Sequence, residues 1–258
     1  MIIVKPKSSA HWYTAGGESC HTTIGANGME RATTLRDARK TNLLPSVTSV
    51  LNVLSRPGLE AWKQEQAILA ALTLPRLDGE GDDAFATRVV ADMQAQVETA
   101  AGFGTAIHAA IEEVNTAGHM DNVPPEIRPW MQLYSQWKNQ NIIRIHSSEA
   151  VVVHPLGYAG RYDLLAQHSE YGECLIDYKT QNVKNGKPKF YEAWAYQLAA
   201  YRYALNTSCE CISVVIDSNS PSEPVQKLWT AEEIDTGLAI FKASLKIWQS
   251  QRGYIPSV

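Results

Sequence analysis

The feature that most restricts the fold is a pair of apolar runs, YDLLA and CLIDYK, which lie between residues 160 and 180 and are separated by a short polar segment. Their composition and the polar break between them predict a β-hairpin. Asp163, Asp177 and Lys179 interrupt these apolar runs. Strand interiors usually exclude Asp, and burying an unpaired charge is costly. The hairpin must therefore provide partners for three charges.

The register of this hairpin decides which charges meet. Side chains alternate along a strand, so Asp177 and Lys179 share one face. If the turn centres on Glu170, Asp163 and Asp177 lie directly opposite each other, with Cβ atoms roughly 4.5–5.5 Å apart. A turn centred further along the chain breaks this alignment.

Two interpretations of the charged hairpin follow from that register. Two facing carboxylates repel unless a cation lies between them, and Mg²⁺ favours such oxygens together with substrate phosphate. Lys179 could then orient a water or stabilise transition-state charge. In the alternative, the hairpin is only salt-bridged, with Lys179 neutralising one Asp. Spacing alone leaves both interpretations open.

The order of elements predicts an α/β fold with a central mixed β-sheet flanked by helices and an N-terminal helical portion. The chain has 258 residues and 45% hydrophobic composition, which suits one domain, with an extension and helical portion over 1–100 and a core over 101–258. Short strands are expected at 2–5 and 11–14. The predicted helices are 47–54, 59–74, 83–100, 104–116, 125–139, 189–206 and 231–249, and the predicted strands are 142–154, 157–167, 173–179, 211–217 and 225–229.

Composition narrows the class of protein. The net charge of −4 gives no global signal for nucleic acid, although a local basic groove stays possible. The N-terminus lacks the apolar core of a signal peptide, and no run approaches the length of a membrane span, so we expect a soluble intracellular, cytoplasmic protein. The cysteines Cys20, Cys174, Cys209 and Cys211 have no zinc-site spacing and are expected to be free thiols.

Two predicted helices carry polar residues beside an apolar stripe. His108 lies four residues before Glu112 in GTAIHAAIEEV, and Gln197 lies four residues before Tyr201 in a helix rich in aromatic residues. Histidine suits metal ligation, but a structural hydrogen bond is the commoner role. If Gln197 is buried, its amide needs a hydrogen-bond partner. Otherwise it lies at the margin of the apolar stripe of an ordinary amphipathic helix.

The ordered set of these motifs resembles the RecB-like branch of the PD-(D/E)XK nuclease superfamily. In sequence order they are G-x-x-x-H at 104–108, Glu149, G-x-x-D at 160–163, D-x-K-T at 177–180 and Q-x-x-x-Y at 197–201. Upstream, the segments HWY at 11–13 and LPSVTSVLNVL at 44–54 also look similar to the mitochondrial genome maintenance exonuclease and its phage relatives.

This resemblance implies an αβββαβ core and a set of roles. One or two Mg²⁺ or Mn²⁺ ions would bind His108, Asp163, Asp177 and the Tyr178 carbonyl. Lys179 would position the attacking water, Glu149 would orient the site or touch a second metal, and Gln197 and Tyr201 would bind DNA or support the active centre. Some relatives carry an iron–sulfur cluster, but this chain lacks the third downstream cysteine, so no cluster is expected.

The path of DNA is less constrained by the sequence. The segment NVKNGKPKF follows the catalytic motif and carries Lys184, Lys187 and Lys189, which are expected to track phosphates unless the loop is merely solvated. Gly104 would allow close approach of a phosphate, and Thr180 completes the adjoining motif. Aromatic residues at helical spacing, Phe103, Trp130, Tyr134 and Trp137, fit either base stacking or the core.

The expected function is a metal-dependent DNA exonuclease that acts on single strands or duplex ends in recombination, repair or phage DNA metabolism. One alternative is a RecE-like duplex 5′→3′ exonuclease that works with a single-strand annealing or single-strand-binding protein. A nicking or restriction-like endonuclease is a further enzyme alternative. The non-enzyme alternative is a degenerate nuclease fold that only binds nucleic acid, with no membrane partner in any case.

Overall fold

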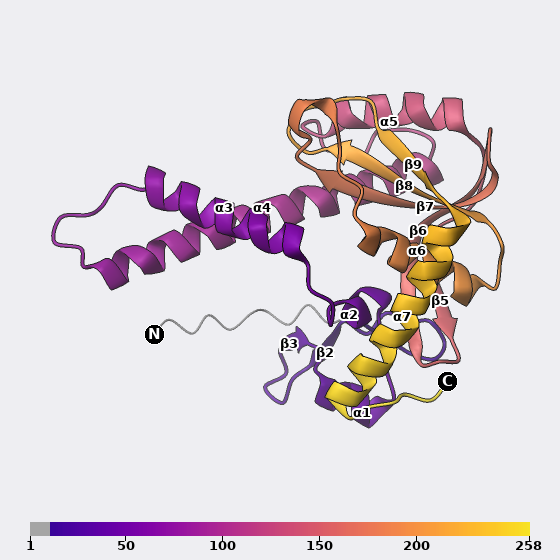
Figure 1. Cartoon of the computed structure of the whole chain (residues 1–258), viewed down its shortest axis with the longest axis horizontal. Coiled ribbons are helices and arrows are strands. Elements are labelled where there is room, and N and C mark those ends of the chain that lie inside the picture. The colour runs from indigo at the N-terminus through magenta and orange to yellow at the C-terminus, as the bar shows by residue number, and fades with distance from the viewer. Residues whose placement is uncertain (1–10) are drawn as a thin grey trace.

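A central five-stranded sheet organises the computed structural model, which describes residues 11–258 (Figure 1). The strands lie in the order β5-β6-β7-β8-β9, and only the β7–β8 pair is parallel. The strand bounds are β5 Ile142–His154, β6 Tyr158–His168, β7 Gly172–Gln181, β8 Glu210–Asp217 and β9 Val225–Trp229. The predicted α/β class with a mixed central sheet is therefore confirmed.

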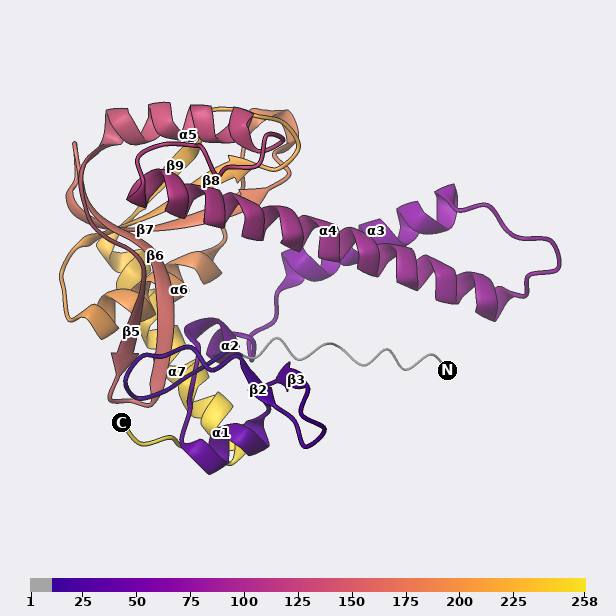
Figure 2. The same ribbon diagram turned by 180° about the vertical axis from the view of Figure 1, so that it is seen from behind.

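Helices cover both faces of the sheet (Figures 1 and 2). The C-terminal part of α4 and the helix α5 pack on one face, and α6 and α7 pack on the other. The helix bounds are α1 Leu35–Thr41, α2 Val47–Leu51, α3 Pro57–Thr73, α4 Asp82–Thr116, α5 Arg128–Asn141, a 3₁₀ turn η1 Lys184–Gly186, α6 Glu192–Leu205 and α7 Ala231–Arg252.

Strand alternation separates two apolar cores. On β7, Leu175 enters the core under α6 and α7, whereas its neighbours Cys174 and Ile176 enter the core under α4 and α5. Both faces of β7 are therefore buried, as expected for a strand that has a parallel neighbour and helices on both sides. The three charged positions of the hairpin lie on this central, doubly covered strand or on its neighbour.

Helices α3 and α4 form a long hairpin that projects from the body (Figure 1). We call residues 57–101 the arm. Only Ala70 and Val89 are buried within it, whereas the remainder of α4 enters the body through Ile107, Ala110, Ile111 and Val114. The same helix is thus an exposed rod at one end and a core element at the other.

The N-terminal segment wraps against the sheet and α7. Strand β1 Trp12–Tyr13 pairs with β4 Leu44–Pro45, and β2 Thr22–Ile24 pairs with β3 Glu30–Ala32. Helix α1 begins with a capping box in which Thr34 and Asp37 bond each other's backbone amides. Tyr13 packs with Leu44 and Ala159, which fixes this segment beside β6.

Several local expectations were wrong. The helices expected at 83–100 and 104–116 are one continuous helix, because Gly102 and Gly104 cost stability inside a helix but do not end it. The sequence reading also missed α1 and the β2–β3 hairpin, whose short segments lack a long periodic pattern. The strand expected at 2–5 lies outside the described residues, and the division into a single domain stays a prediction.

No helix among residues 11–258 combines the length and the apolarity that a bilayer span requires.

Candidate metal and phosphate site

The hairpin has the register that places Asp163 and Asp177 opposite each other. Strands β6 and β7 pair from His168↔Gly172 to Leu164↔Ile176, so the turn centres on Glu170, which is one of the two registers that the sequence left open. The pairing stops one residue before the two acids. Beyond that point β6 continues beside β5, while β7 continues beside β8 (Figure 2). The carboxylates therefore lie where two strands diverge.

Asp163 occupies this fork between the strands. Its Oδ2 accepts a hydrogen bond from the backbone amide of Tyr178 at 2.7 Å, in place of the ladder bond that the diverging strands no longer make. A carboxylate that accepts a backbone amide bond is held in position without using both of its oxygens. Its Oδ1 lies 3.6 Å from Nδ1 of His108.

A second acid reaches the same point from β5. The pairs Ser148↔Leu164 and Ala150↔Tyr162 flank Glu149, which places Glu149 across from Asp163. Glu149 has a φ of 51°, a left-handed conformation that costs a non-glycine residue on the order of 1–3 kcal/mol and concentrates at functional sites. Its Oε1 lies 3.9 Å from Nδ1 of His108.

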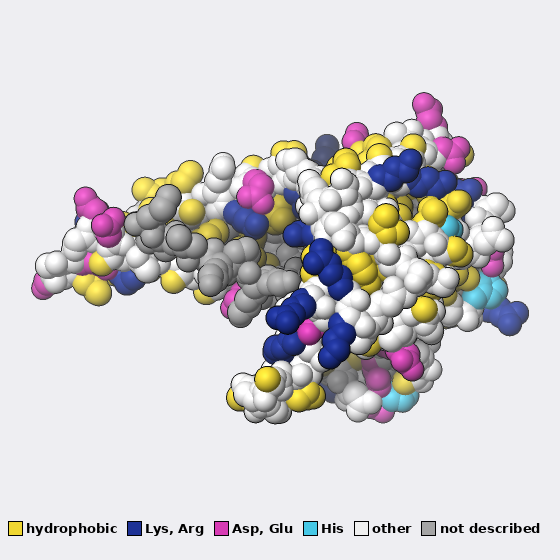
Figure 3. Space-filling view, turned by 90° about the horizontal axis from the view of Figure 1, so that it is seen from below, with side chains coloured by type: hydrophobic (Ala, Val, Ile, Leu, Met, Phe, Trp, Pro, Cys, Tyr) yellow, Lys and Arg dark blue, Asp and Glu magenta, His cyan; other side chains and the backbone are white. Residues whose placement is uncertain are grey.

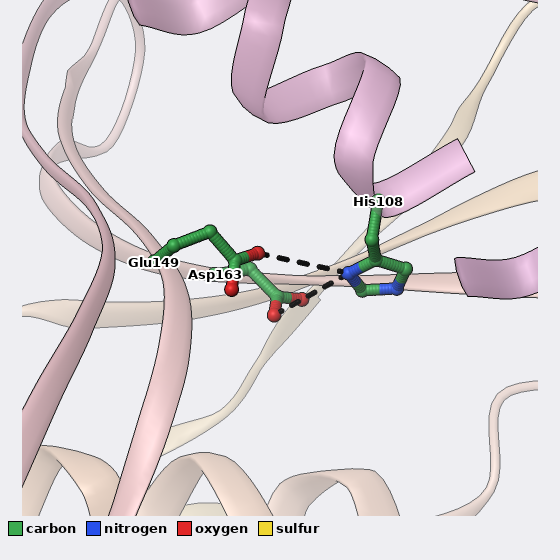
Figure 4. Close-up of side chains that lie close together, drawn as sticks. All are labelled: His108, Glu149 and Asp163. Carbon is green, nitrogen blue, oxygen red and sulfur yellow. Dashed lines mark ion pairs between the residues drawn. The ribbon is translucent and has the colours of Figure 1, made fainter. Parts of the chain in front are cut away.

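His108, Glu149 and Asp163 form a group of metal-ligand type (Figure 4). One nitrogen or oxygen atom from each residue lies within 4.8 Å of the others. His108 comes from the last turns of α4, where the neighbouring Ile107 and Ile111 are buried in the core. The helix, β5 and β6 thus each supply one side chain to a common point.

Asp177 and Lys179 form the adjoining half of the site. The Asp177 side chain is 3% exposed, and Lys179 Nζ donates to its Oδ1 at 2.8 Å. Oδ2 lies 2.7 Å from the same nitrogen but takes no hydrogen bond. Buried carboxylate oxygens are normally bonded, so this one has capacity for a further cation. The residue types and this spare oxygen fit a hard divalent ion.

Lys179 is itself held by α6. Its Nζ donates to Oε1 of Gln197 at 3.1 Å, and Nε2 of Gln197 donates to the hydroxyl of Tyr201 at 3.1 Å. Gln197 is half-buried, and its partners are Lys179 on one side and Tyr201 on the other. This chain of bonds directs the ammonium toward Asp177 and leaves 22% of the lysine side chain exposed.

Two glycines of the motifs allow close packing beside the site. A Cβ at Gly160 would overlap the ring of Tyr201, and a Cβ at Gly104 would lie 3.0 Å from the hydroxyl oxygen of Thr180. Both glycines therefore have a packing reason. Gly104 and Thr180, which were expected to bind nucleic acid, lie against each other.

Burial and mutual charge shift the protonation of the group. Burial lowers the pKa of His108, but the charge of Asp163 and the carboxylate of Glu149 outweigh it, and the net shift is upward. Burial raises the pKa of Asp163 to about 7; His108 opposes this shift and Asp177 adds to it. Without a cation the group therefore retains protons near neutral pH, which a metal would have to displace.

The loop after β7 places its lysines on the surface. Nζ of Lys184 lies 3.3 Å from Oε1 of Glu65 on the arm. The side-chain amide of Gln181 donates to the carbonyl of Lys189 and accepts from its backbone amide. Lys187 is exposed as well. Seen from below, Lys and Arg side chains gather where the arm meets the body (Figure 3).

The aromatic residues of α5 divide between core and margin. Tyr134 and Trp137 are buried, so base stacking is excluded for them, while Phe103 and Trp130 are half-buried and contact each other. The hydroxyls of Tyr134 and Tyr178 lie 2.9 Å apart in the core behind the site. Sequence reasoning missed this pair because its two members are far apart in the chain.

All four cysteines are free thiols, as expected. Cys209 and Cys211 are buried in the core under α6, Cys174 is buried in the core under α5, and Cys20 is half-buried at the N-terminal segment. The absence of an iron–sulfur cluster stays a prediction.

Comparisons with known proteins give slight structural likenesses. No protein-family model matches the chain, and no curated protein matches it either. Among solved structures, it is similar to SSO0001 (14% identity, 56% of this chain and 72% of that one, TM-score 0.30). It is also similar to an alkaline exonuclease, LHK-Exo, from Laribacter hongkongensis (16% identity, 75% and 98%, TM-score 0.30). The same exonuclease in complex with dAMP gives 16% identity, 73% and 91% coverage and a TM-score of 0.30. Such scores assign no activity, so function has to be inferred from the side chains of this chain.

Proposed function

We propose that this protein is a divalent-metal-dependent DNA exonuclease that hydrolyses phosphodiester bonds on single strands or duplex ends. The observation that supports it most is the convergence of His108, Glu149 and Asp163 beside the Asp177–Lys179 pair at one strand fork. A salt-bridged hairpin would need only Lys179 and one acid. It would not need two further ligand-type residues, one of them in a left-handed conformation.

A bound Mg²⁺ or Mn²⁺ would be held by His108, Asp163, Asp177 and the Tyr178 carbonyl, with Glu149 beside them. When bound, such an ion polarises a phosphoryl oxygen and makes water a better nucleophile. The pKa of His108 is raised, so this residue would have to lose its proton to hold such an ion. The Tyr178 amide keeps Asp163 at the fork while that exchange occurs.

Lys179 is proposed to act on the reacting groups themselves. Gln197 and Asp177 direct its ammonium, and its exposed part can donate to a phosphate oxygen or to the attacking water. Tyr201 supports Gln197 from behind. Gln197 is therefore a positioning residue, and its proposed contact with DNA is secondary to its bond to Lys179.

The cellular role is proposed at a coarser level. Recombination, repair or phage DNA metabolism inside the cell would use such an activity, and a RecE-like duplex 5′→3′ enzyme partnered with a single-strand annealing protein is the enzyme alternative. The exposed Lys184, Lys187 and Lys189 are proposed to contact phosphates. Replacing all three should flatten the dependence of DNA binding on salt.

The test is incubation of end-labelled linear single-stranded, linear duplex and circular DNA with Mg²⁺ or Mn²⁺. We expect degradation of linear DNA that stops on chelation and falls at least about 10²-fold in Asp177→Ala and Lys179→Ala. The matched control is Lys227→Ala, because Lys227 forms a comparable 2.7 Å ion pair with Glu233 away from the site.

Each other outcome points to a different conclusion. Activity that survives both site substitutions would remove the site assignment. Cleavage of circles would indicate an endonuclease. Metal-dependent DNA binding without any cleavage would favour the degenerate, binding-only module.

A further inference from the structure

Arg161 lies beside the proposed metal site without a role in it. It precedes Asp163 by two residues on β6, so the two side chains leave the strand on the same face. Two residues of an antiparallel strand span roughly 6.8 Å, which is comparable to one nucleotide step of an extended strand. A phosphate neighbouring the one at Asp163 would therefore come within reach of Arg161.

The guanidinium has unused hydrogen-bonding capacity. Its Nη1 lies 3.9 Å from Oε2 of Glu149, and its Nη2 donates to the hydroxyl of Ser19 at 3.3 Å. Among residues 11–258 this is the one hydrogen bond that it makes, although an arginine carries five donors. The side chain is 44% exposed, and a long, exposed ion pair contributes little. Most of the donors are thus free for an incoming anion.

Neutral groups of the N-terminal segment surround this arginine. The ring of His21 stacks on that of His11 at 4.4 Å and contacts Tyr13 edge-on at 5.1 Å. Burial, with the nearby charge of Arg161 adding to it, lowers the pKa of His11, and burial likewise lowers that of His21, so both imidazoles are uncharged at neutral pH. The Trp12 amide donates to Nδ1 of His21, which leaves Nε2 of His21 as an N–H donor.

The charge balance of this group changes when a cation binds. Glu149 lies between the metal-ligand group and Arg161, and its two oxygens face His108 and the guanidinium respectively. A cation that engages Glu149 would weaken its attraction for Arg161. The freed guanidinium would then have an anion-binding geometry next to a phosphodiester site, and guanidinium pairs with phosphate in a bidentate manner.

We infer that Arg161, held by Ser19 and flanked by His21, binds the phosphate of the substrate strand next to the one that is cleaved. This inference rests on the proposed nuclease function and assigns a use to the HWY segment and to the connection between β1 and β2. Ser19 and His21 are positioning residues or secondary donors in this pocket, and Arg161 supplies its permanent positive charge.

The test is a chemical double-mutant cycle on a short single-stranded oligonucleotide, with Ca²⁺ present to limit turnover. One phosphate at a time is replaced by an uncharged methylphosphonate, and the dissociation constant is measured for wild type, Arg161→Gln and Arg161→Lys. We expect Arg161→Gln to bind the unmodified strand about 10-fold more weakly, with a log–log salt slope smaller by about 0.7. One methylphosphonate position should weaken wild type by a similar factor and leave Arg161→Gln unchanged. Arg161→Lys should recover part of the salt slope.

Arg144→Gln is the matched control, because Arg144 is an exposed arginine at the other end of the same β5–β6 hairpin. It should behave as wild type throughout, and thermal unfolding verifies that each variant is folded. If wild type cleaves and binds DNA while Arg161→Gln gives the same affinity and the same methylphosphonate profile, the inference is wrong and the nuclease proposal stands. If wild type neither binds nor cleaves DNA with any divalent ion, both are wrong.

Discussion

The central sheet and the arm differ in how much of each is buried against the rest of the protein. Strand β7 is buried without interruption from Cys174 to Tyr178, and every second side chain of β6 is buried from Tyr158 to His168. The arm spans residues 57–101, yet only Ala70 and Val89 are buried in it, and Ile68 and Leu72 are largely exposed. Packing between two helical layers therefore fixes the geometry of the sheet, whereas the two helices of the arm contact mainly each other and bury little apolar surface.

The two regions also differ in charge. Residues 57–101 contain eight acidic and three basic residues, so the net charge of the arm is 3 − 8 = −5. The net charge of the whole chain is −4, so the rest of the protein carries a slight excess of basic residues. Lys and Arg side chains gather instead on the body near the base of the arm (Figure 3). A nucleic-acid strand is repelled by the first surface and attracted by the second. If the proposed DNA substrate binds, we expect it to approach along the body.

His108 connects these two regions, because α4 belongs to both. The candidate ligand lies just past the point where the helix enters the core, beside the fully buried Ile107. A metal ligand has to be held in a fixed position by packed surroundings, and of the two ends of α4 only the one in the body is packed in a core. The arm can then vary in position without moving the imidazole.

The largest expected effect compares two truncations on either side of this boundary. Ile107→Ala should lower the free energy of unfolding by about 2–5 kcal/mol, because it leaves a cavity in a closed core. Leu72→Ala, at a side chain that is 77% exposed, should change it by less than about 0.5 kcal/mol. Urea unfolding of both variants measures the difference. A comparable loss in both would mean that the arm packs against a further surface in solution.

The sequence pattern predicted those parts of the site that depend on residues close together in the chain. The hairpin itself was predicted from YDLLA and CLIDYK, and the structure then selects the Glu170-centred turn, the register in which Asp163 lies across from Asp177. The left-handed Glu149 and the divergence of β6 from β7 were not predictable this way. They lie where β6 pairs with β5 and β7 pairs with β8, and these pairings join strands whose order in the sheet the sequence pattern does not give. The contact between Arg161 and Ser19 joins residues 142 positions apart, beyond any periodic signal.

The next prediction concerns the protons held at the fork. The folded pKa of His108 lies above its ordinary value, so the stability it contributes is present at low pH and is lost as the pH rises through that pKa. The pKa of Asp163 is raised to about 7, so between about pH 4 and 7 the folded protein holds a proton that the unfolded chain has lost, and the metal-free fold loses stability over that range. Both groups make the metal-free protein less stable at pH 8 than at pH 6.

A divalent ion should reverse that loss, because it competes with the same protons. At an ion concentration of 100 times its dissociation constant, the stabilisation should approach about 2.7 kcal/mol, and the rise in Tm should be larger at pH 8 than at pH 6. Thermal unfolding with Mn²⁺ or with chelator measures it. Asp163→Asn should remove most of both effects, while a rise in Tm that is equal at the two pH values would contradict the assignment of the ligands.

The smallest effects come from a pair of glycines, Gly160 in the packed sheet and Gly102 at an exposed position of α4 just past the arm. Gly160→Ala should destabilise the fold by about 1–3 kcal/mol, because the new methyl group overlaps the ring of Tyr201 and the body cannot yield. Gly102→Ala, where a Cβ meets no atom within 4 Å, should stabilise α4 by up to about 1 kcal/mol. The two changes add the same methyl group, so their opposite signs in chemical unfolding isolate the surroundings as the cause.

Because Tyr201 holds Gln197 and Gln197 holds Lys179, Gly160→Ala should also lower the cleavage rate, whereas Gly102→Ala should leave it unchanged. If Gly102→Ala instead destabilised the protein, helix propensity would not govern this exposed part of α4, and the contrast with the packed sheet would no longer hold.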